Sequence, residues 1–437
     1  MSIENLHAVP NLTTVQTGPL RKIEQHLLDH QSAIENWFRN QWRKTPAPFY
    51  ASVDLRNAGF KLAPVDTNLF PAGFNNLNSA FMPLCIQATQ SALEHICPDA
   101  NRVVIVPENH TRNAAYLESL AMLQEILTKA GYETKIGSIN PELDSAQTHK
   151  LESGRQITLH PLQRHGDKVG IDDFLPCVVL LNNDLSSGQP EILQGIEQTI
   201  IPPMRSGWAH RLKSGHFGHY QQVTEEFGQQ TNIDPWLINP LFTTCGEINF
   251  MKREGEDCIA HNVGNLLESI QAKYDEYDIK EPPFIIVKAD AGTYGMGVMT
   301  INSIEEAREL NRKQRTKMSK TKGGQAVSKV ILQEGVYTFE SWGSEQAVAE
   351  PVVYMLDHFV VGGFYRVHTG RGRNENLNAP GMHFEPLAFA EPCNSPNENM
   401  PPDACPNRFY AYGVIARLAL LAAARELDEL KRDNQES

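Results

Sequence analysis

The sequence predicts an α/β protein, with some α+β character, from two observations. A short apolar strand at residues 102–106 precedes a helix at about 114–130 that ends at a glycine, and a second strand follows directly. Such a strand–helix–strand run indicates parallel strands joined by a right-handed crossover. Two further apolar runs, at 284–287 and 298–301, flank a glycine-rich loop and predict a hairpin.

The composition limits the classes of protein to which the chain can belong. Its 437 residues suffice for two or three domains, and the apolar fraction of 41% is ordinary for a globular protein. The net charge of −13 argues against a nucleic-acid partner, because phosphate backbones attract cationic surfaces. No apolar run approaches the ~20 residues that span a bilayer, so no membrane partner is expected. The seven scattered cysteines and the lack of an evident signal peptide favour a cytoplasmic location.

The amino-terminal part predicts a helix followed by a strand pair. Apolar side chains recur at helical spacing from Leu20 to Trp42, which predicts one amphipathic helix. In the strand pair that follows, Asp54 ends the first strand, and Asp66 and Asn68 end the second. Side chains two residues apart in a strand point to the same side, so these oxygens could converge on Mg²⁺. The alternative is that they only cap turns.

The glycine-rich hairpin could close over a triphosphate. Lys288 follows its first strand directly, and Gly292, Gly295 and Gly297 form its loop. Glycines let backbone N–H groups approach phosphates, and the lysine adds a positive charge at the base of the loop. The GxxGxG spacing differs from both the Walker loop and the dinucleotide fingerprint. On these residues alone, a tight surface hairpin beside a lysine is an equally good interpretation.

Polar residues that follow buried strands supply further candidates for ligand binding. Arg112 and Asn113 lie in the loop after the strand at 102–106, and Arg112 could hold a substrate carboxylate through two hydrogen bonds. The alternative is a solvated surface loop. Towards the carboxyl end, Glu334 lies in an apolar strand and Arg366 lies on the second strand of a hairpin.

The order of these features resembles the ATP-grasp fold, and bacterial glutathione synthetase in particular. A helix lysine, a lysine-led glycine hairpin, a strand with an acidic residue and an arginine–asparagine loop follow one another as in that fold. The residues that would bind ATP by this resemblance are Lys213, Lys288, Gly292, Gly295, Gly297, Glu334 and Asn376.

The end of the chain departs from the ATP-grasp order. There, a metal motif E-x-N-x-x-P follows the last strands, whereas here a long helix from about residue 409 follows. A similar string runs from Asp66 to Pro71 near the amino terminus. We therefore expect a circular permutation in which residues 49–77 complete the sheet of residues 206–430. The predicted domains are 1–98 (helix, strand pair and linker helix), 99–205 (a Rossmann-like substrate domain before the ATP-grasp unit) and 206–437 (the ATP-grasp domain).

Nearly the whole chain also resembles the proteobacterial-type, or third, group of glutamate–cysteine ligases. The strings that carry this resemblance are SVDLRNAGFKLAPVDTNLFPAGFNNL, PENHTRN, LLNNDLSSG, RLKSGHF and IVKADAGTYGMGVM. The resemblance implies ATP- and Mg²⁺-dependent ligation of the glutamate γ-carboxylate to cysteine through γ-glutamyl phosphate, the first step of glutathione biosynthesis. The implied partners are thus glutamate, cysteine and ATP, and a homo-oligomer stays open.

This resemblance implies roles for the remaining candidates. The catalytic residues would be Lys288, Arg366 and Arg373. The substrate ligands would be Arg56, Asn75, Asn76, Arg112 and Asn113. The metal ligands would be Asp54, Asp66 and Asn68. Two other interpretations remain: another amino-acid ligase of the same fold, such as glutathione synthetase, or a non-catalytic nucleotide-binding protein.

Overall fold

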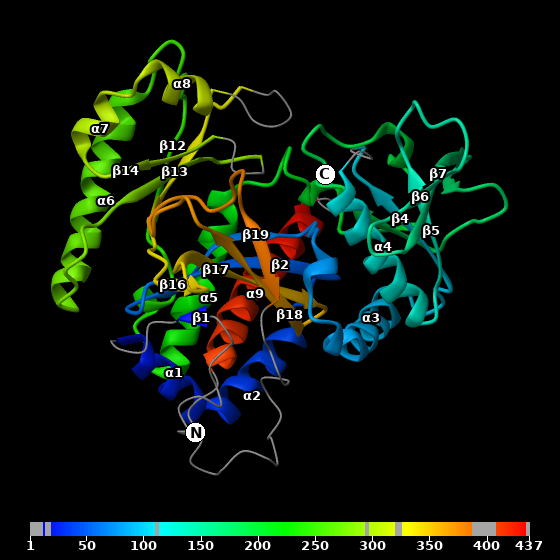
Figure 1. Ribbon diagram of the computed structural model, residues 1–437, viewed down its shortest axis with the longest axis horizontal. Coiled ribbons are helices and arrows are strands. Elements are labelled where there is room, and N and C mark those ends of the chain that lie inside the picture. Colours follow the sequence, from blue (N-terminus) through cyan, green and yellow to red (C-terminus); the bar gives the residue numbers. More distant parts are fainter. Residues whose placement is uncertain are drawn as a thin grey trace.

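The computed structural model describes residues 12–13, 19–109, 113–292, 297–319, 326–386 and 408–433. Within these ranges, helices pack around three main sheets, which confirms the mixed α/β class (Figure 1). No helix in these ranges combines the length and the apolar character needed to cross a membrane.

The helices follow the predicted periodicity with two differences. They are α1 (Pro19–Asp29), α2 (Gln31–Trp42), α3 (Met82–Ile96), α4 (Ala114–Lys129), α5 (Lys213–Thr231), α6 (Glu256–Glu276), α7 (Ile304–Arg308), α8 (Arg312–Met318) and α9 (Arg408–Asp433). The single helix expected from Leu20 to Trp42 is wrong, because the chain breaks at His30 between α1 and α2. The apolar stripe continues through both helices, so its period does not reveal the break. Helix α6 was not predicted.

A seven-stranded antiparallel sheet lies at the centre of the molecule (Figure 1). Its strands are β1 (Leu12–Thr13), β2 (Tyr50–Asn57), β3 (Leu62–Asn68), β16 (Glu340–Trp342), β17 (Ala347–Leu356), β18 (Phe359–His368) and β19 (His383–Pro386). Strand β2 pairs with β17, and Asp54 lies opposite Val352. The amino-terminal strand pair therefore joins a sheet whose long strands come from the carboxyl-terminal third of the chain.

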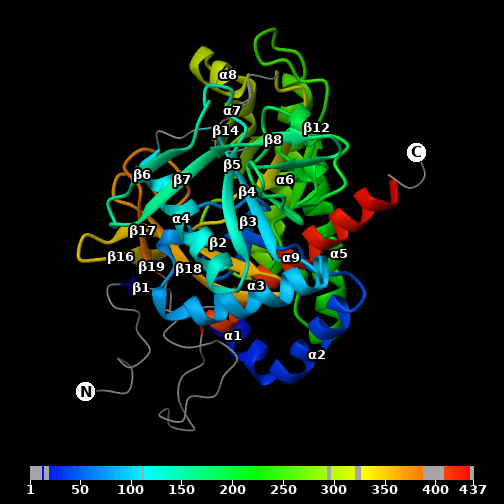
Figure 2. The same ribbon diagram turned by 90° about the vertical axis from the view of Figure 1, so that its right-hand side faces the viewer.

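A second sheet, mostly parallel, forms a lobe at the right of Figure 1 that faces the viewer in Figure 2. Its order is β11 (Thr199–Ile201), β10 (Val178–Asn182), β4 (Arg102–Pro107), β5 (Glu133–Ser138), β7 (Gln156–Pro161) and β6 (Gln147–Lys150), and only β6 runs antiparallel to its neighbour. Helix α4 connects the parallel neighbours β4 and β5, which confirms the predicted strand–helix–strand unit. A separate hairpin pairs β8 (Gln163–His165) with β9 (Lys168–Gly170).

The third sheet has four antiparallel strands and contains the glycine-rich hairpin. Its order is β12 (Phe242–Cys245), β15 (Val330–Glu334), β13 (Ile285–Ala289) and β14 (Val298–Ile301). The pairing of β13 with β14, with Lys288 opposite Val298, confirms the predicted hairpin. One cluster of buried apolar side chains joins this sheet to α5, α9 and the central sheet, as Val287, Phe217, Leu420 and Val53 illustrate. This shared core fixes the two sheets against each other.

Candidate active site

A cavity of about 100 Å³ lies between the four-stranded sheet and the central sheet. Residues of β2, β3, β13, β15, β17, β18 and α5 line it, so both ends of the chain contribute. Its ionisable lining residues are Asp54, Arg56, Asp66, Lys213, Lys288, Glu334, Glu350 and Arg366. Seven of these eight are predicted site residues, and Gly292 and Asn376 also line the cavity.

Lys288 connects the glycine hairpin to the amino-terminal strand pair. Its Nζ donates to the carbonyl oxygen of Val65 at 2.6 Å and to Oε1 of Gln333 at 2.7 Å. Burial lowers the pKa of Lys288 to about 8; Asp66 opposes this shift, and Lys213 adds to it. A buried lysine held beside a carboxylate and a second lysine is suited to binding a polyanion.

Lys213 is fixed at the start of α5 by the end of the hairpin strand. Its backbone N–H donates to the carbonyl oxygen of Asp290 at 2.8 Å, and its Nζ donates to the carbonyl oxygen of Gly292. The carboxylate of Asp290 in turn accepts from the N–H and hydroxyl of Ser214, both at 2.7 Å. The Nζ also lies 3.9 Å from the centroid of the Trp208 ring, a cation–π contact. These bonds place the second lysine beside the glycine loop.

Asp54 and Asp66 face each other across the β2–β3 pair. They are direct partners in the strand register, so their side chains lie on the same face. Burial raises the pKa of Asp54 despite Arg366. For Asp66 burial acts in the same direction, but Lys213 and Lys288 outweigh it and the pKa is lowered. Two carboxylates on adjacent strands that line one cavity fit Mg²⁺, which prefers oxygen ligands.

Glu350 joins two arginines of the cavity wall. Its Oε2 accepts from Nε of Arg56 at 2.9 Å, and its Oε1 accepts from Nη1 of Arg366. Nη1 of Arg366 also donates to Oδ2 of Asp54 at 2.9 Å. Nε of Arg366 is buried and has no hydrogen-bond partner among the described residues. Arg366 thus keeps a free donor for a ligand.

The guanidinium of Arg56 makes more hydrogen bonds within the protein than we expect of a residue that binds substrate. Besides Glu350, its guanidinium donates to the carbonyl oxygens of Val336, at 3.1 Å, and Glu375. These bonds hold the wall of the cavity together. We therefore expect Arg56 to shape the site more than to release its bonds to a substrate.

Glu334 sits at the other end of the cavity in a buried ion pair. Its Oε2 accepts from Nζ of Lys61 at 2.6 Å and from the N–H of Leu241 at 2.9 Å. Both side chains of the ion pair are 0% exposed, and the Lys61 ammonium lies 4.1 Å from the centroid of the Trp236 ring. Oε1 of Glu334 has no partner in the part of the chain that the structure describes. That oxygen can accept a hydrogen bond from a ligand.

Several predicted ligands lie away from the cavity. The amide of Asn68 bonds both backbone groups of Phe70, so this residue caps a turn, which is the alternative interpretation of the motif. Asn113 caps α4 by accepting from the N–H of Tyr116 at 3.3 Å. Arg373 is exposed and lies 5.1 Å from the centroid of the Phe339 ring. None of these three predicted ligands is among the described residues that line the cavity.

The remaining predicted ligands are placed only in part. Asn75 and Asn76 lie in a short 3₁₀ turn, where their amides bond each other at 3.3 Å, and the described cavity lining does not include them. Gly295 and Arg112 lie outside the described residues.

Four residues that build the site were not predicted from the sequence. They are Lys61, Asp290, Gln333 and Glu350. Glu350 offered a signal, because a carboxylate inside a long apolar strand needs a cationic partner. Lys61 offered less, because its partner Glu334 lies 273 positions away in the sequence.

The Lys61–Glu334 pair provides a prediction on stability. Replacing Lys61 with methionine leaves the Glu334 carboxylate buried without its cation, and we expect the free energy of unfolding to fall by about 3–5 kcal/mol. Urea denaturation measures this change. The double variant Lys61→Met/Glu334→Gln removes the stranded charge and should recover much of the loss. A double variant as unstable as Lys61→Met would contradict this account of the pair.

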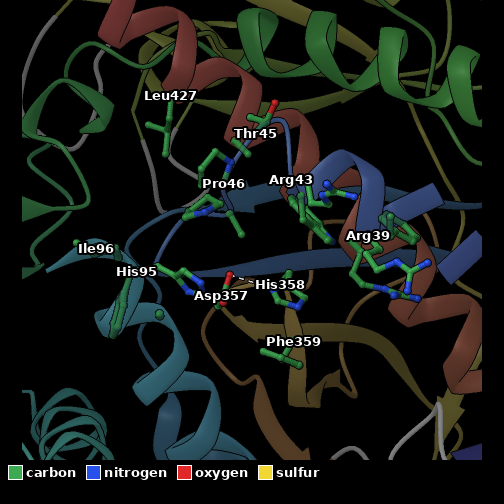
Figure 3. Close-up of a pocket in the computed structure, with 18 of the residues that line it drawn as sticks. Arg39, Arg43, Thr45, Pro46, His95, Ile96, Asp357, His358, Phe359 and Leu427 are labelled. Carbon is green, nitrogen blue, oxygen red and sulfur yellow. Dashed lines mark ion pairs between the residues drawn. The ribbon is translucent and has the colours of Figure 1, made fainter. Parts of the chain in front are cut away.

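A larger cavity of about 1320 Å³ lies elsewhere in the protein. Figure 3 shows Arg39 of α2, Arg43 directly after that helix, His95 of α3 and Leu427 of α9 around it. The turn between β17 and β18 closes it with the Asp357–His358 ion pair, at 3.0 Å. It shares no lining residue with the small cavity. Volume alone therefore does not identify the site, and the convergence of buried charges does.

A small cavity lined by two buried lysines, Gly292 and paired carboxylates is suited to a phosphate-bearing substrate. The chain matches the family model described as glutamate-cysteine ligase over residues 24–427. It is 61% identical to an inferred gamma-glutamylcysteine synthetase from Methylobacillus flagellatus KT, with a TM-score of 0.88; the match covers 96% of this chain and 98% of that one. A search of curated proteins finds no match.

Two more distant solved structures are similar only in part. D-alanyl-alanine synthetase A from Vibrio cholerae O1 biovar eltor str. N16961 is 9% identical, covers 73% of this chain and 81% of its own, and has a TM-score of 0.32. A glutathione synthetase-like effector from Globodera pallida is 10% identical, covers 84% and 80%, and has a TM-score of 0.34.

The chain belongs to the glutamate–cysteine ligase family. It is accordingly an ATP-dependent ligase that joins glutamate to cysteine, and the alternative of glutathione synthetase is not favoured.

Proposed function

We propose that this ligase activates glutamate as γ-glutamyl phosphate in the small cavity, where cysteine then attacks it. A carboxylate is a poor electrophile, and transfer of the ATP γ-phosphoryl group converts it into an acyl phosphate. The observation that carries the proposal is the hydrogen bond from Lys288 to the carbonyl oxygen of Val65, at 2.6 Å. Through this bond, the ammonium of Lys288 in the glycine hairpin contacts the residue next to Asp66, which lies on the central sheet.

The residues of the cavity divide into four tasks. Lys213 and Lys288 bind the phosphates as point charges. Oε1 of Glu334 accepts a hydrogen bond from the adenine amino group. The buried Nε of Arg366 stabilises the negative charge that develops on the transferring phosphoryl group and on the tetrahedral intermediate. Asp54 and Asp66 would hold Mg²⁺, which would neutralise charge on the phosphate oxygens.

The glycine hairpin has a second task, which follows from its place beside the cavity. Gly292 and Val298 of the hairpin both line the cavity, so the hairpin would lie beside the phosphates bound there. In that position it keeps water from the acyl phosphate and so prevents hydrolysis. Gly292 and Gly297, with φ of 94° and 67°, give the hairpin the left-handed backbone conformations that favour glycine.

We further infer that the fold is a circularly permuted ATP-grasp with a Rossmann-like substrate domain. Support comes from β2, which pairs with β17 although some 300 residues of chain separate them. Residues 1–98 and 206–437 would then share one sheet, and residues 99–205 would form the substrate domain on their own parallel sheet. The cytoplasmic location and a homo-oligomeric state stay predictions.

The pH dependence of ATP binding is expected to report on Lys288. A lysine loses its charge as the pH rises through its pKa, which burial lowers to about 8 here. The KM for ATP should therefore rise above about pH 8, whereas a lysine of ordinary pKa would hold it constant to about pH 10. Initial rates at saturating glutamate and cysteine measure it.

Burial also lowers the pKa of Lys61 to about 8, so a conservative variant of Lys288 is needed to show which lysine causes the pH dependence. The guanidinium of Lys288→Arg stays charged throughout this range, so its KM for ATP should vary little with pH. If the KM for ATP still rises above about pH 8 in Lys288→Arg, another group causes the pH dependence.

Phosphate release tests the reaction itself. We expect ATP turnover to require both glutamate and cysteine and to yield γ-glutamylcysteine. Turnover that instead requires γ-glutamylcysteine and glycine would indicate glutathione synthetase. ATP binding without turnover for either pair would contradict the proposed catalytic role of the cavity.

A further inference from the structure

Two cysteines outside the small cavity lie within contact distance of each other. Sγ of Cys245 and Sγ of Cys258 are 3.1 Å apart, and both thiols are free. A disulfide bond measures about 2.05 Å, so the two sulfurs need to approach by only about 1 Å to bond. Cys245 ends β12, and Cys258 lies in the first turn of α6. The side-chain geometry therefore brings two oxidisable groups together from separate elements.

The surroundings of the two sulfurs differ in a way that sets an order of reaction. Cys258 is exposed, whereas Cys245 is buried and 1% exposed. The amide Nδ2 of Asn262 lies 3.2 Å from Sγ of Cys245 and 3.4 Å from Sγ of Cys258, so one donor serves both. Burial raises the pKa of the Cys245 thiol to about 12, and the adjacent Cys258 thiol adds to that shift. An external reagent thus reaches Cys258 first.

We propose that Cys245 and Cys258 form a redox modification site that reacts with low-molecular-weight disulfides. The sulfur of Cys258, as a thiolate, attacks one sulfur of the reagent; a mixed disulfide forms and one thiolate leaves. The Cys245 thiol then loses its proton to solvent, and its sulfur attacks Cys258, which closes the protein disulfide and releases the second thiolate. Overall, two protein thiols are oxidised and one external disulfide is reduced to two thiols.

The cysteine pair lies at the edge of the four-stranded sheet that carries the glycine hairpin. Strand β12 pairs with β15 from Phe242 to Cys245, and it begins next to Leu241, whose N–H donates to the carboxylate of Glu334. The disulfide would close a short loop between β12 and α6 and tie the helix to this strand. The site is separate from the reaction centre, since neither cysteine lines the small cavity.

Cystine is a suitable reagent, because it is the oxidised form of the family's thiol substrate. The reduced full-length enzyme is freed of reductant and treated with cystine, without ATP or glutamate, so the outcome does not depend on ligase activity. We expect a peptide map to link Cys245 with Cys258 and show a loss of two hydrogen atoms across the pair. A reducing agent should restore both thiols. A wild-type enzyme with both thiols unmodified, or with an adduct on Cys258 and a free Cys245, would overturn the proposal.

Single variants test the order of attack. Cys245→Ser should keep one cysteine adduct on Cys258, because no second thiol displaces it. Cys258→Ser should leave Cys245 reduced. Cys97→Ser is the matched control, since Cys97 lies at the end of α3 in another part of the fold, and this variant should form the Cys245–Cys258 link as the wild type does. Oxidation of Cys245 in Cys258→Ser at the wild-type rate would contradict the assigned order.

Discussion

Replacing Lys288 with alanine is expected to abolish ligation while leaving the fold intact. The lysine gives the site a buried cation between Val65 and Gln333, and alanine removes its charge from the phosphates. Loss of one preorganised donor to the reacting groups typically costs about 10²–10³ in kcat. Val65 and Gln333 both line the cavity, where water can replace the lost donor, so the variant should still fold. Steady-state rates, with circular dichroism as the check on folding, measure the effect.

Lys280→Ala is the matched control for this variant. Lys280 lies eight positions before Lys288, but its side chain is 80% exposed. Among the described residues, it forms an ion pair with Asp278. Its removal should leave the rate unchanged, because an exposed ion pair contributes little. Wild-type rates in Lys288→Ala would remove the assignment of the hairpin to phosphate binding.

Replacing Asp66 with asparagine is expected to raise the Mg²⁺ requirement strongly or to remove activity. Lys213 and Lys288 outweigh the effect of burial and lower the pKa of Asp66, so its carboxylate is ionised at neutral pH. Asparagine keeps the shape and removes the charge. We expect the Mg²⁺ concentration at half-maximal rate to rise by about 10–100-fold. Mutation of residues that only contact the metal ligands already lowers metal affinity by this factor. Rates at fixed ATP and varied Mg²⁺ measure it.

The variant Asn68→Ala tests whether Asn68 is a metal ligand or a turn cap. The motif implies that Asn68 is a metal ligand, whereas the structure shows its amide bonded to the backbone of Phe70. The structure therefore predicts a Mg²⁺ requirement close to that of the wild type in Asn68→Ala. If Asp66→Asn leaves the Mg²⁺ dependence unchanged, the metal site on β2 and β3 is wrong, and the permutation loses its chemical support.

Much of the half of the site that the glycine hairpin and its sheet supply could be predicted from the sequence, because its signals are local. The hairpin with Lys288 and the strand with Glu334 each occupy a short segment whose apolar pattern and glycines define it. The pairing of β2 with the carboxyl-terminal sheet could also be predicted. The metal motif expected near the carboxyl terminus is absent there, and a similar string occurs near the amino terminus. Confirmation came from the register of Asp54 opposite Val352.

The remaining contacts depend on chain folding and leave no local signal. Lys61 meets Glu334, and Arg56 meets Glu350, across 273 and 294 positions of sequence. A motif also cannot distinguish two side chains of the same type: Arg366 lines the cavity, and Arg373, seven positions later, lies against Phe339 outside it. The same holds for Asn68, where a turn cap and a metal ligand share one spacing.

Transfer of a heavy-oxygen label tests the central claim of γ-glutamyl phosphate formation most directly. Glutamate labelled in both γ-carboxylate oxygens is supplied with ATP, Mg²⁺ and cysteine, and the inorganic phosphate is analysed by mass spectrometry. If the carboxylate attacks the γ-phosphoryl group, one labelled oxygen passes to each phosphate when the amine displaces it. The account predicts one label in each phosphate released. Phosphate free of label, with γ-glutamylcysteine still formed, would contradict it.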